Sequence, residues 1–505
     1  MKLILSSLLL LFAFFLSAQP KSDPGGWCGT TEKSAWLEKY QAGAYPRGEK
    51  SAGVRYVPMN VVFVGDDTDE NYPNPTKFLK SMELLNSDFR NQNVQFFISG
   101  VIKYLPSTRY NRHDISLGRE MMRANNIDAH LNTYVVERID PSICGYYAGG
   151  IADAVALGRG CLGAGDRTWS HEVGHYLSLP HTFYGWESLD LIDNIDLNEP
   201  APETVNYRGR DILVEKVDGS NCADAADGFC DTAPDYLMQR WQCTNQGTYR
   251  DSLLDPDNVR FAVPAFNIMS YANDACVTGF TDDQKGAMFA NLDGRLGLVS
   301  EFTPDTVGAD ASQMALLAPE DGARLVYRDS VKLVWNSAPN ADFYVVQVND
   351  INNFNTAVTI ARTTTDTSIT ITTGLRSRTD YYWRVRPVNN YVVGSEFVGT
   401  STFRNGRQLT ATVNAALDAA ITVAPNPVAG GQTLRVSGEN LDAGGELNYQ
   451  LINTAGQVLV NRSGIQVSAF DFEENIDVSN LPAGVYFLRL RMNDRLVARR
   501  IIVTP

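Results

Sequence analysis

The segment from His171 to His181, HEVGHYLSLPH, constrains the fold of this chain more than any other. It holds three of the five histidines in the sequence. His171 and His175 are four residues apart, so on a helix both side chains leave the same face. Pro180 directly precedes His181, so the helix has to end and the chain has to turn back before the third histidine. Such a turn would bring three imidazole groups to one point.

Imidazoles at this spacing bind a single zinc ion, so we expect His171, His175 and His181 to be its ligands. Three protein ligands leave the fourth position open for water, as in catalytic sites, whereas a structural site is normally closed by a fourth Cys or His. Glu172 is placed to reach that water and to act as general base and acid. The pattern therefore predicts a zinc hydrolase that cleaves peptide bonds.

A second signal lies downstream at residues 267–271, NIMSY, which has the form of a Met-turn. Together with HEVGHYLSLPH, it resembles the metzincin metalloproteases and, within them, the pappalysin family. The segments CADAADGFCDT at 222–232 and LLNSDF at 84–89 are similar to those of the family as well. The resemblance covers about half of the chain, from residue 53 to residue 300.

The resemblance implies an α/β (α+β) catalytic domain with an upper mixed sheet, an active-site helix and an irregular lower lobe. It implies that Met269 forms an apolar floor beneath the metal, and that Tyr271 donates a hydrogen bond to the reacting carbonyl oxygen. Ser178 departs from the family, which usually has Gly there because the chain turns with a positive φ. The strand before the helix, Ile151–Leu157, is expected to pair with extended substrate.

Acidic residues cluster between Cys222 and Cys243. Carboxylates at this density beside a turn glycine can bind calcium, although an acidic loop is more often simply solvated. The resembling family carries structural calcium near this position, which implies Asp227, Asp231 and Thr232 as ligands. Family members also often favour basic residues just after the cut bond, and Asp274 is a candidate for lining that pocket.

Seven cysteines in an exported chain predict three disulfides and one remaining thiol. Cys144 and Cys161 bracket the segment before the helix and are expected to pair. The other four candidates form two bridges whose connectivity the sequence leaves open: Cys222, Cys230, Cys243 and Cys276. The odd cysteine, Cys28, is either an ordinary free thiol or a cysteine switch whose thiolate occupies the open zinc position before activation.

The first residues predict export. One lysine, an apolar run to Leu16 and a small residue before the expected cut at Ala18 form a secretory signal peptide over residues 1–18, and residues 19–52 form a short propeptide. No other stretch approaches the 18 apolar residues of a spanning helix, so no transmembrane segment is expected. The net charge of −15 argues against nucleic acid as a partner.

Three domains are expected after the propeptide. Residues 53–305 form the protease domain, and 313–406 alternate like a fibronectin type III β-sandwich. Residues 419–505 form another small β-sandwich. Their sequence closely resembles the C-terminal sorting domain of the type IX secretion system, which implies that secretion machinery as a partner and a secreted or cell-surface location.

Two other functions fit parts of the sequence. The chain could be a surface adhesin in which the metal site is vestigial and the two β-sandwiches bind the partner. It could also be a zinc amidase acting on a substrate other than protein. The complete HExxH, the third histidine and the Met-turn favour the endopeptidase over the adhesin.

Overall fold

The computed structural model describes residues 27–140, 143–187, 197–295, 297–298, 306–325, 330–356, 359–406, 415–439, 441, 446–467, 471–492 and 495–505. The expected signal peptide and the propeptide up to residue 26 lie outside the described residues. The chain divides into two compact units, and each is treated by itself below. Unit 1 comprises Met1–Gly322, Lys332–Ile371 and Tyr381–Thr402, and unit 2 comprises Ala323–Val331, Thr372–Asp380 and Phe403–Pro505.

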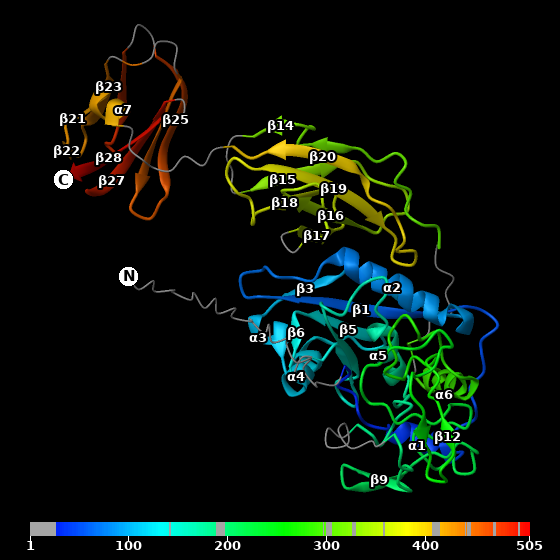
Figure 1. Cartoon of the computed structure of the whole chain (residues 1–505). Helices are drawn as coiled ribbons and strands as arrows, with labels where there is room; N and C mark the ends of the chain where they lie inside the picture. Colours follow the sequence, from blue (N-terminus) through cyan, green and yellow to red (C-terminus); the bar gives the residue numbers. More distant parts are fainter. Residues whose placement is uncertain are drawn as a thin grey trace, which may run out of the picture. The chain divides into compact units, whose positions relative to one another are not determined.

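A mixed sheet forms the frame of unit 1, as the sequence predicts (Figure 1). Its strand order is β2-β1-β5-β8-β7, and β3 also pairs with β1. All pairs are parallel except that of β7 with β8. The strands are β1 (Arg55–Gly65), β2 (Val94–Ile98), β3 (Lys103–Pro106), β5 (Leu131–Val136), β7 (Gly145–Ala148) and β8 (Ala154–Gly158).

Two sequence-based expectations about these strands are wrong. The sequence pattern from Val94 to Tyr104 predicts one strand, but the chain forms two, β2 and β3, because Gly100 between them turns with a φ of 84°. The strand expected at Ile151–Leu157 begins only at Ala154 and lies inside the sheet, between β5 and β7. The edge strand is β7 instead. An interior strand has no free side for a substrate, so the pairing expected there cannot occur.

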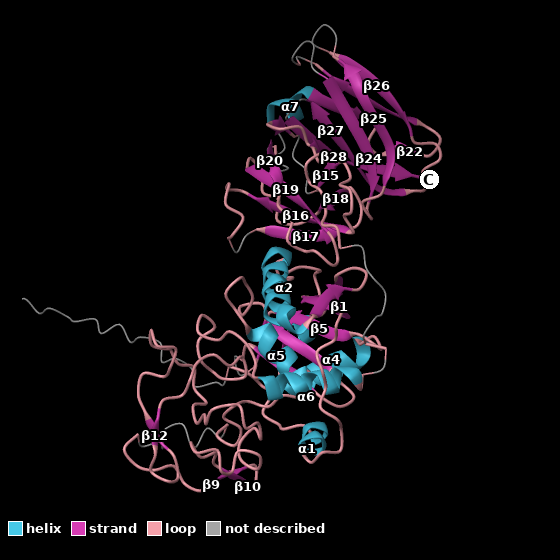
Figure 2. Ribbon diagram, turned by 90° about the vertical axis from the view of Figure 1, so that its right-hand side faces the viewer, coloured by secondary structure: helices cyan, strands magenta, loops and turns pink. Residues whose placement is uncertain are grey.

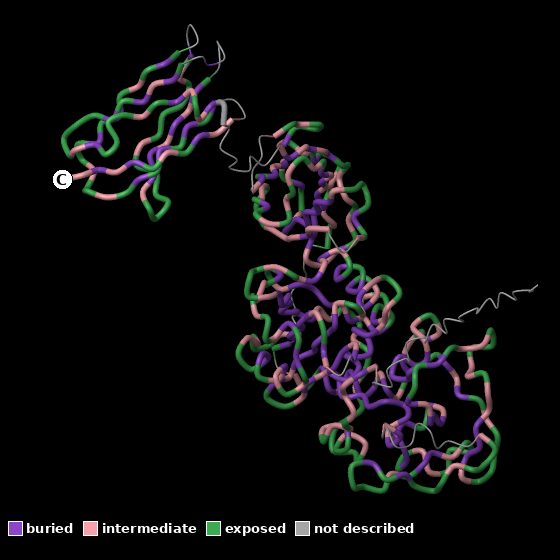
Figure 3. Tube along the Cα trace, turned by 60° about the vertical axis from the view of Figure 1, so that its left-hand side comes forward, coloured by how far each residue is buried: buried purple, intermediate pink, exposed green. Residues whose placement is uncertain are grey.

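Alternation along the strands builds two cores, one on each face of the sheet. On β1, Val61 and Phe63 join a cluster that contains the apolar residues of the helices α2 and α5. Val62 and Val64 point to the opposite face and join Met121 of α4. Figure 2 shows these helices gathered around β1 and β5, and Figure 3 shows which stretches of the chain are buried. The sheet therefore holds α5 in a fixed place on one face.

Local capping explains where the main helices start. Asn74 and Asp114 accept hydrogen bonds from the first turns of α2 and α4, and Thr281 with Gln284 forms a capping box at α6. These helices are α2 (Pro75–Phe89), α4 (Ile115–Asn125), α5 (Thr168–Tyr176) and α6 (Asp282–Asp293). Shorter elements are α1 (Ala35–Gln41), η1 (Arg90–Gln92), α3 (Thr108–Asn111), β4 (Arg112–His113) and β6 (Arg138–Ile139).

The region between α5 and α6 contains little regular structure, in line with the irregular lobe expected from the sequence. Its strands are β9 (Thr204–Tyr207), β10 (Arg210–Leu213), β11 (Leu253–Leu254) and β12 (Arg260–Phe261). Disulfides stabilise it by limiting the freedom of the unfolded chain. The bridges join Cys222 to Cys230 and Cys243 to Cys276, and a third joins Cys144 to Cys161 before α5.

The rest of the chain is β-rich. In unit 1, β13, β15 and β18 form one sheet, and β20-β19-β16-β17 lie in a second. The strands are β13 (Leu316–Ala318), β15 (Val331–Trp335), β16 (Phe343–Asn349), β17 (Ile360–Thr364), β18 (Ser368–Ile371), β19 (Asp380–Val388) and β20 (Val398–Arg404). Trp335 and Trp383 are buried, as expected for a packed sandwich.

Unit 2 contains a two-sheet sandwich with its own apolar core, with orders β21-β23-β26 and β22-β28-β27-β24-β25. The elements of unit 2, of which β14 is not part of this sandwich, are β14 (Ala323–Arg324), α7 (Ala415–Ala420), β21 (Ile421–Ala424), β22 (Val428–Ala429), β23 (Thr433–Gly438), β24 (Glu446–Asn453), β25 (Val458–Gln466), β26 (Phe472–Asp477), β27 (Gly484–Met492) and β28 (Arg495–Thr504). Among the described residues, no helix has the length and apolar character needed to cross a membrane.

Candidate metal centre

Helix α5 brings the first two histidines of the motif together. Every residue of this helix is buried between the sheet and the loops that follow. The helix ends where Ser178 adopts the left-handed conformation expected for it, with a φ of 79°. The Ser178 hydroxyl accepts a hydrogen bond from the Asn291 amide of α6 at 2.7 Å. This bond offsets part of the cost of about 1–2 kcal/mol for a side chain in that conformation.

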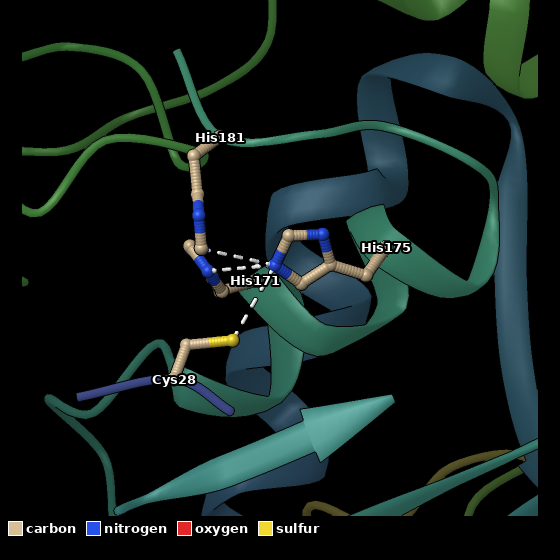
Figure 4. Close-up of side chains that lie close together, drawn as sticks. All are labelled: Cys28, His171, His175 and His181. Carbon is tan, nitrogen blue, oxygen red and sulfur yellow. Dashed lines mark hydrogen bonds between the residues drawn. The ribbon is translucent and has the colours of Figure 1, made fainter. Parts of the chain in front are cut away.

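The three histidines converge on one point (Figure 4). Nε2 of His175 lies 3.1 Å from Nε2 of His171 and 3.2 Å from Nε2 of His181. All three side chains are almost fully buried. Burial lowers the pKa of His181 to about 3 and lowers those of His171 and His175 well below the usual value. The imidazoles are therefore neutral, which is the form that binds a metal ion.

The second ring nitrogen of each imidazole, Nδ1, lies within hydrogen-bond distance of a protein oxygen that orients the ring. Nδ1 of His171 lies 2.7 Å from the carbonyl oxygen of Ile268, and Nδ1 of His175 lies 2.7 Å from that of Leu179. Nδ1 of His181 lies 3.2 Å from the Glu187 carboxylate. A carbonyl oxygen only accepts, so the proton sits on Nδ1 and leaves Nε2 free to bind a metal. The sequence analysis missed Glu187, because no spacing rule marks a residue in the loop after His181.

Cys28 completes the cluster from the N-terminal segment. Its Sγ lies 3.4 Å from Nε2 of His175, and the four ligand atoms all lie within 4.8 Å of one another. It is the free cysteine of the described chain, and it is buried. Burial, followed by the charge of Glu172, raises the pKa of this thiol. A divalent cation among these groups would reverse that shift, since it favours the thiolate.

The donor set fits a tetrahedral metal ion. Ordinary zinc bond lengths place neighbouring nitrogens about 3.3 Å apart, and a sulfur about 3.6 Å from a nitrogen. The nitrogen separations of 3.1 and 3.2 Å and the sulfur–nitrogen separation of 3.4 Å are close to these values. Three imidazoles and a thiol are also ligands that suit zinc. The residues present therefore fit a zinc ion.

Glu172 and Tyr271 both face the N-terminal segment beside the cluster. The Glu172 carboxylate accepts a hydrogen bond from the Thr30 hydroxyl at 3.3 Å through Oε2, whereas Oε1 has no hydrogen-bond partner among the described residues. Burial raises the pKa of Glu172 to about 8. The Tyr271 hydroxyl accepts from the Cys28 amide at 3.1 Å and donates to the Cys28 carbonyl at 3.4 Å.

Met269 lies beneath α5. A Cβ atom added to Gly174 would collide with the Met269 sulfur, so only glycine fits at this helix position. The turn is fixed by Asp235, whose carboxylate accepts hydrogen bonds from Thr182 at 2.7 Å and Ser270 at 2.9 Å. Asp235 thus ties the loop after His181 to the turn around Met269, a positioning role that sequence reasoning missed.

The N-terminal segment runs parallel to the edge strand β7. The Gly29 amide donates to the carbonyl of Gly145 at 2.8 Å, and the Cys144 amide donates to the carbonyl of Trp27 at 2.8 Å. The Tyr147 amide donates to the Thr30 hydroxyl at 2.7 Å. A cavity of about 810 Å³ adjoins this segment and reaches His175 and Ser178. The segment therefore lies along the only open side of the sheet next to the cluster among the described residues.

The three residues expected to bind calcium each have a hydrogen-bond partner within the protein. Thr232 donates a hydrogen bond to Oδ1 of Asp227 at 3.0 Å, and Oδ2 of Asp231 accepts from the amide of Asp283 at 2.7 Å. Two carboxylate oxygens in this region, on Asp227 and Glu215, are buried and have no partner among the described residues. Burial, reinforced by the charge of Asp227, raises the pKa of Glu215 to about 9.

A family model matches the C-terminal part of the chain. Residues 422–504 match the secretion system C-terminal sorting domain. The chain thus carries a type IX secretion sorting domain, which indicates export and an outer-membrane or cell-surface location. It also implies engagement with the secretion machinery. No curated protein matches the chain.

Solved structures similar to parts of the chain include three of interest. The FN1–FN3 domains of chicken CNTN1 are 13% identical with a TM-score of 0.23, covering 37% of this chain and 66% of that one. The fibronectin(III)-like modules of Clostridium thermocellum CbhA are 12% identical with a TM-score of 0.20, covering 38% and 94%. PorZ, a surface component of the type IX secretion system of Porphyromonas gingivalis, is 18% identical with a TM-score of 0.14, covering 24% and 15%.

Proposed function

We propose that this chain is an exported zinc-dependent endopeptidase that is held latent by its own N-terminal segment. The observation that carries the proposal is the convergence of His171, His175, His181 and Cys28, four buried groups whose ligand atoms lie within 4.8 Å of one another. Three of the donors come from α5 and the turn after it. The fourth comes from the N-terminal segment, which pairs with the edge of the sheet at Gly145.

When bound, zinc would supply a Lewis acid and a water molecule of lowered pKa. Glu172 accepts a proton from the attacking water and returns it to the leaving amine. Its unpartnered Oε1 is the oxygen available for this transfer. The Tyr271 hydroxyl, which now holds the backbone of Cys28, is free to donate to the carbonyl oxygen of a substrate once the segment has left.

Cys28 supports the latent state. Its sulfur occupies the position of a fourth ligand, and Thr30 holds the carboxylate of the proposed base. A thiolate in this position would exclude the attacking water. Activation therefore requires the segment around Cys28 to be displaced or cut away.

The edge strand β7 indicates which class of substrate the chain binds. Once the segment has left, the backbone groups of β7 that pair with Trp27 and Gly29 are free to pair with another extended chain. Pairing of this type recognises backbone rather than particular side chains. Unfolded proteins and peptides therefore match this edge, which favours the endopeptidase over an amidase with a small substrate.

We also propose a structural calcium ion near Asp227. Support comes from the buried, unpartnered oxygens on Asp227 and Glu215, because buried carboxylates without partners are costly unless a cation compensates them. Thr232, which donates to Asp227, offers a neutral oxygen beside it. Asp231 stays in the proposed set, although its Oδ2 accepts a hydrogen bond from the first turn of α6.

The test uses the full chain in four forms: wild type, Cys28→Ala, Glu172→Ala, and the double variant. Each is loaded with zinc, its metal content is measured, and denatured casein is added with and without a zinc chelator. We expect Cys28→Ala to cleave casein, the chelator to abolish cleavage, and the double variant to keep its zinc while losing at least about 100-fold in rate. A zinc-loaded Cys28→Ala chain that cleaves nothing, even after the segment around Cys28 has been cut away, would overturn the proposal and favour a binding protein.

A further inference from the structure

Trp27, the residue before Cys28, occupies a pocket beside the metal centre. Its indole ring lies edge-on to the ring of His171, with centroids 4.7 Å apart, and edge-on to Tyr271 at 5.6 Å. The guanidinium carbon of Arg240 lies 4.3 Å from the centroid of the indole ring. We call the space bounded by His171, Tyr271 and Arg240 the Trp27 pocket.

Arg240 is fixed at the wall of this pocket by two partners. One nitrogen donates to Oδ2 of Asp274 at 2.7 Å, and another donates to the carbonyl of Ala272 at 3.0 Å. The second oxygen of the Asp274 carboxylate accepts from the backbone amide of Arg167 at 3.2 Å. Both oxygens of Asp274 are thus engaged, and the side chain is only 14% exposed.

These contacts argue against the expectation that Asp274 attracts a basic substrate residue. The charged group that lies against Trp27 is the guanidinium group of Arg240, and Asp274 is engaged in an ion pair with it. A guanidinium group attracts the face of an aromatic ring and repels an ammonium or a second guanidinium group. The side chain that fills the pocket in this structure is aromatic, in agreement with that chemistry.

Building on the proposed function, we propose that the Trp27 pocket binds an aromatic side chain of the substrate, on a residue flanking the cut bond, and that Arg240 excludes lysine and arginine there. The position follows from the chain, since Trp27 is directly bonded to the residue whose sulfur lies at the metal centre. Arg240 is the residue that determines this specificity, and Asp274 positions it.

A first test needs no catalysis. Full chains carrying Glu172→Ala, which prevents self-cleavage, also carry Trp27→Phe, Trp27→Lys, or Trp27→Lys with Arg240→Ala. Amide hydrogen exchange is measured over residues 27–34, where the Gly29 amide pairs with β7. We expect exchange with Trp27→Lys to be at least about 10-fold faster than with Trp27→Phe, since a cation replaces a ring beside Arg240.

Arg240→Ala exposes the Asp274 carboxylate to the new lysine, so the double change should slow exchange again towards the Trp27→Phe value. Exchange at β1 amides reports whether each variant keeps its fold, and Arg240→Met serves in place of Arg240→Ala if that variant unfolds. Equal exchange for Trp27→Lys and Trp27→Phe, or no recovery on removing Arg240, would overturn the pocket assignment.

A second test maps the cut bonds in a peptide mixture treated with the zinc-loaded Cys28→Ala chain. Aromatic residues should flank the cuts, and Arg240→Ala should shift the preference towards lysine and arginine by at least about 10-fold. Cuts beside lysine or arginine while Arg240 is present would overturn the pocket assignment and leave the endopeptidase standing. If no peptide is cut, the proposed function fails, and the exchange experiment still decides what the pocket binds.

Discussion

The histidine cluster and the acidic loop around Asp227 are both buried sets of polar side chains, yet they are built differently. In the cluster, the ligand atoms face one point, and each imidazole is held from behind by a carbonyl or a carboxylate. In the acidic loop, Asp227 and Thr232 bond to each other, while Asp231 bonds to α6. The comparison shows that the cluster brings its donor atoms to one point, whereas in the acidic loop some carboxylate oxygens are already engaged by other protein groups.

The largest effect should come from removing the central ligand of the cluster. Nε2 of His175 lies next to all three other donor atoms, so His175→Ala leaves them without a common neighbour. We expect zinc affinity to fall by more than about 100-fold, beyond the range seen when only a supporting residue is changed. Metal content after dialysis against a zinc buffer measures this, with His130→Ala as the matched control. Full retention of zinc by His175→Ala would place the metal elsewhere.

The second-largest effect on zinc affinity should come from Glu187, which supports His181. Glu187→Ala removes the carboxylate that holds Nδ1 of His181, and we expect zinc affinity to fall by about 10–100-fold. Glu187→Gln keeps an oxygen that can accept from Nδ1, so its loss should be smaller. Competition with a fluorescent zinc chelator measures both. Equal zinc affinities for wild type and Glu187→Ala would show that the Glu187 carboxylate is not needed to hold His181.

Loss of calcium from the acidic loop should have a smaller effect, and only on the thermal stability of the fold. A calcium concentration of 100 times its Kd would stabilise the fold by about 2.7 kcal/mol, a Tm increase of about 3 °C for a unit of this size. Asp227→Asn should remove most of this shift and leave zinc binding unchanged. Calorimetry with zinc present, before and after selective calcium chelation, measures it. An unchanged Tm would eliminate the calcium ion from the acidic loop.

The smallest effect concerns the residue that ends α5. Ser178→Gly relieves the positive φ but loses the hydrogen bond from Asn291, so the two changes of about 1 kcal/mol should nearly cancel. Ser178→Ala keeps the unfavourable φ and loses the bond, so it should destabilise the chain by about 1 kcal/mol more than glycine does. Thermal unfolding of the two variants side by side measures the difference, and an alanine variant as stable as glycine would contradict it.

The same contrast explains which parts of the site could be predicted from the sequence. His171, His175 and His181 lie on one short helix and the turn after it, so their spacing alone predicts the geometry. Glu187, Asp235 and the pairing of Arg240 with Asp274 depend on loops brought together by the fold, and no local pattern marks them.

Some elements of the fold could likewise be predicted from the sequence, and others could not. The run of β-branched residues at Val54–Val64 predicts a strand, which is found as β1, and the spacing of Phe78, Met82, Leu85 and Phe89 predicts a helix, which is found as α2. The edge strand β7 was missed because it has only four residues, in the Gly-Tyr-Tyr-Ala segment. A strand this short carries almost no alternation, so its position beside β8 is decided by tertiary pairing.

The pairing of Trp27 and Gly29 with the start of β7 also affects whether copies of the chain can aggregate. An edge strand with unpaired backbone groups invites other chains to add to it, and this is a common route to aggregation. While the N-terminal segment covers β7, the sheet presents no such edge there, and copies of the chain cannot join through it. The segment that holds Cys28 beside the three histidines thus also closes this edge of the sheet to other chains.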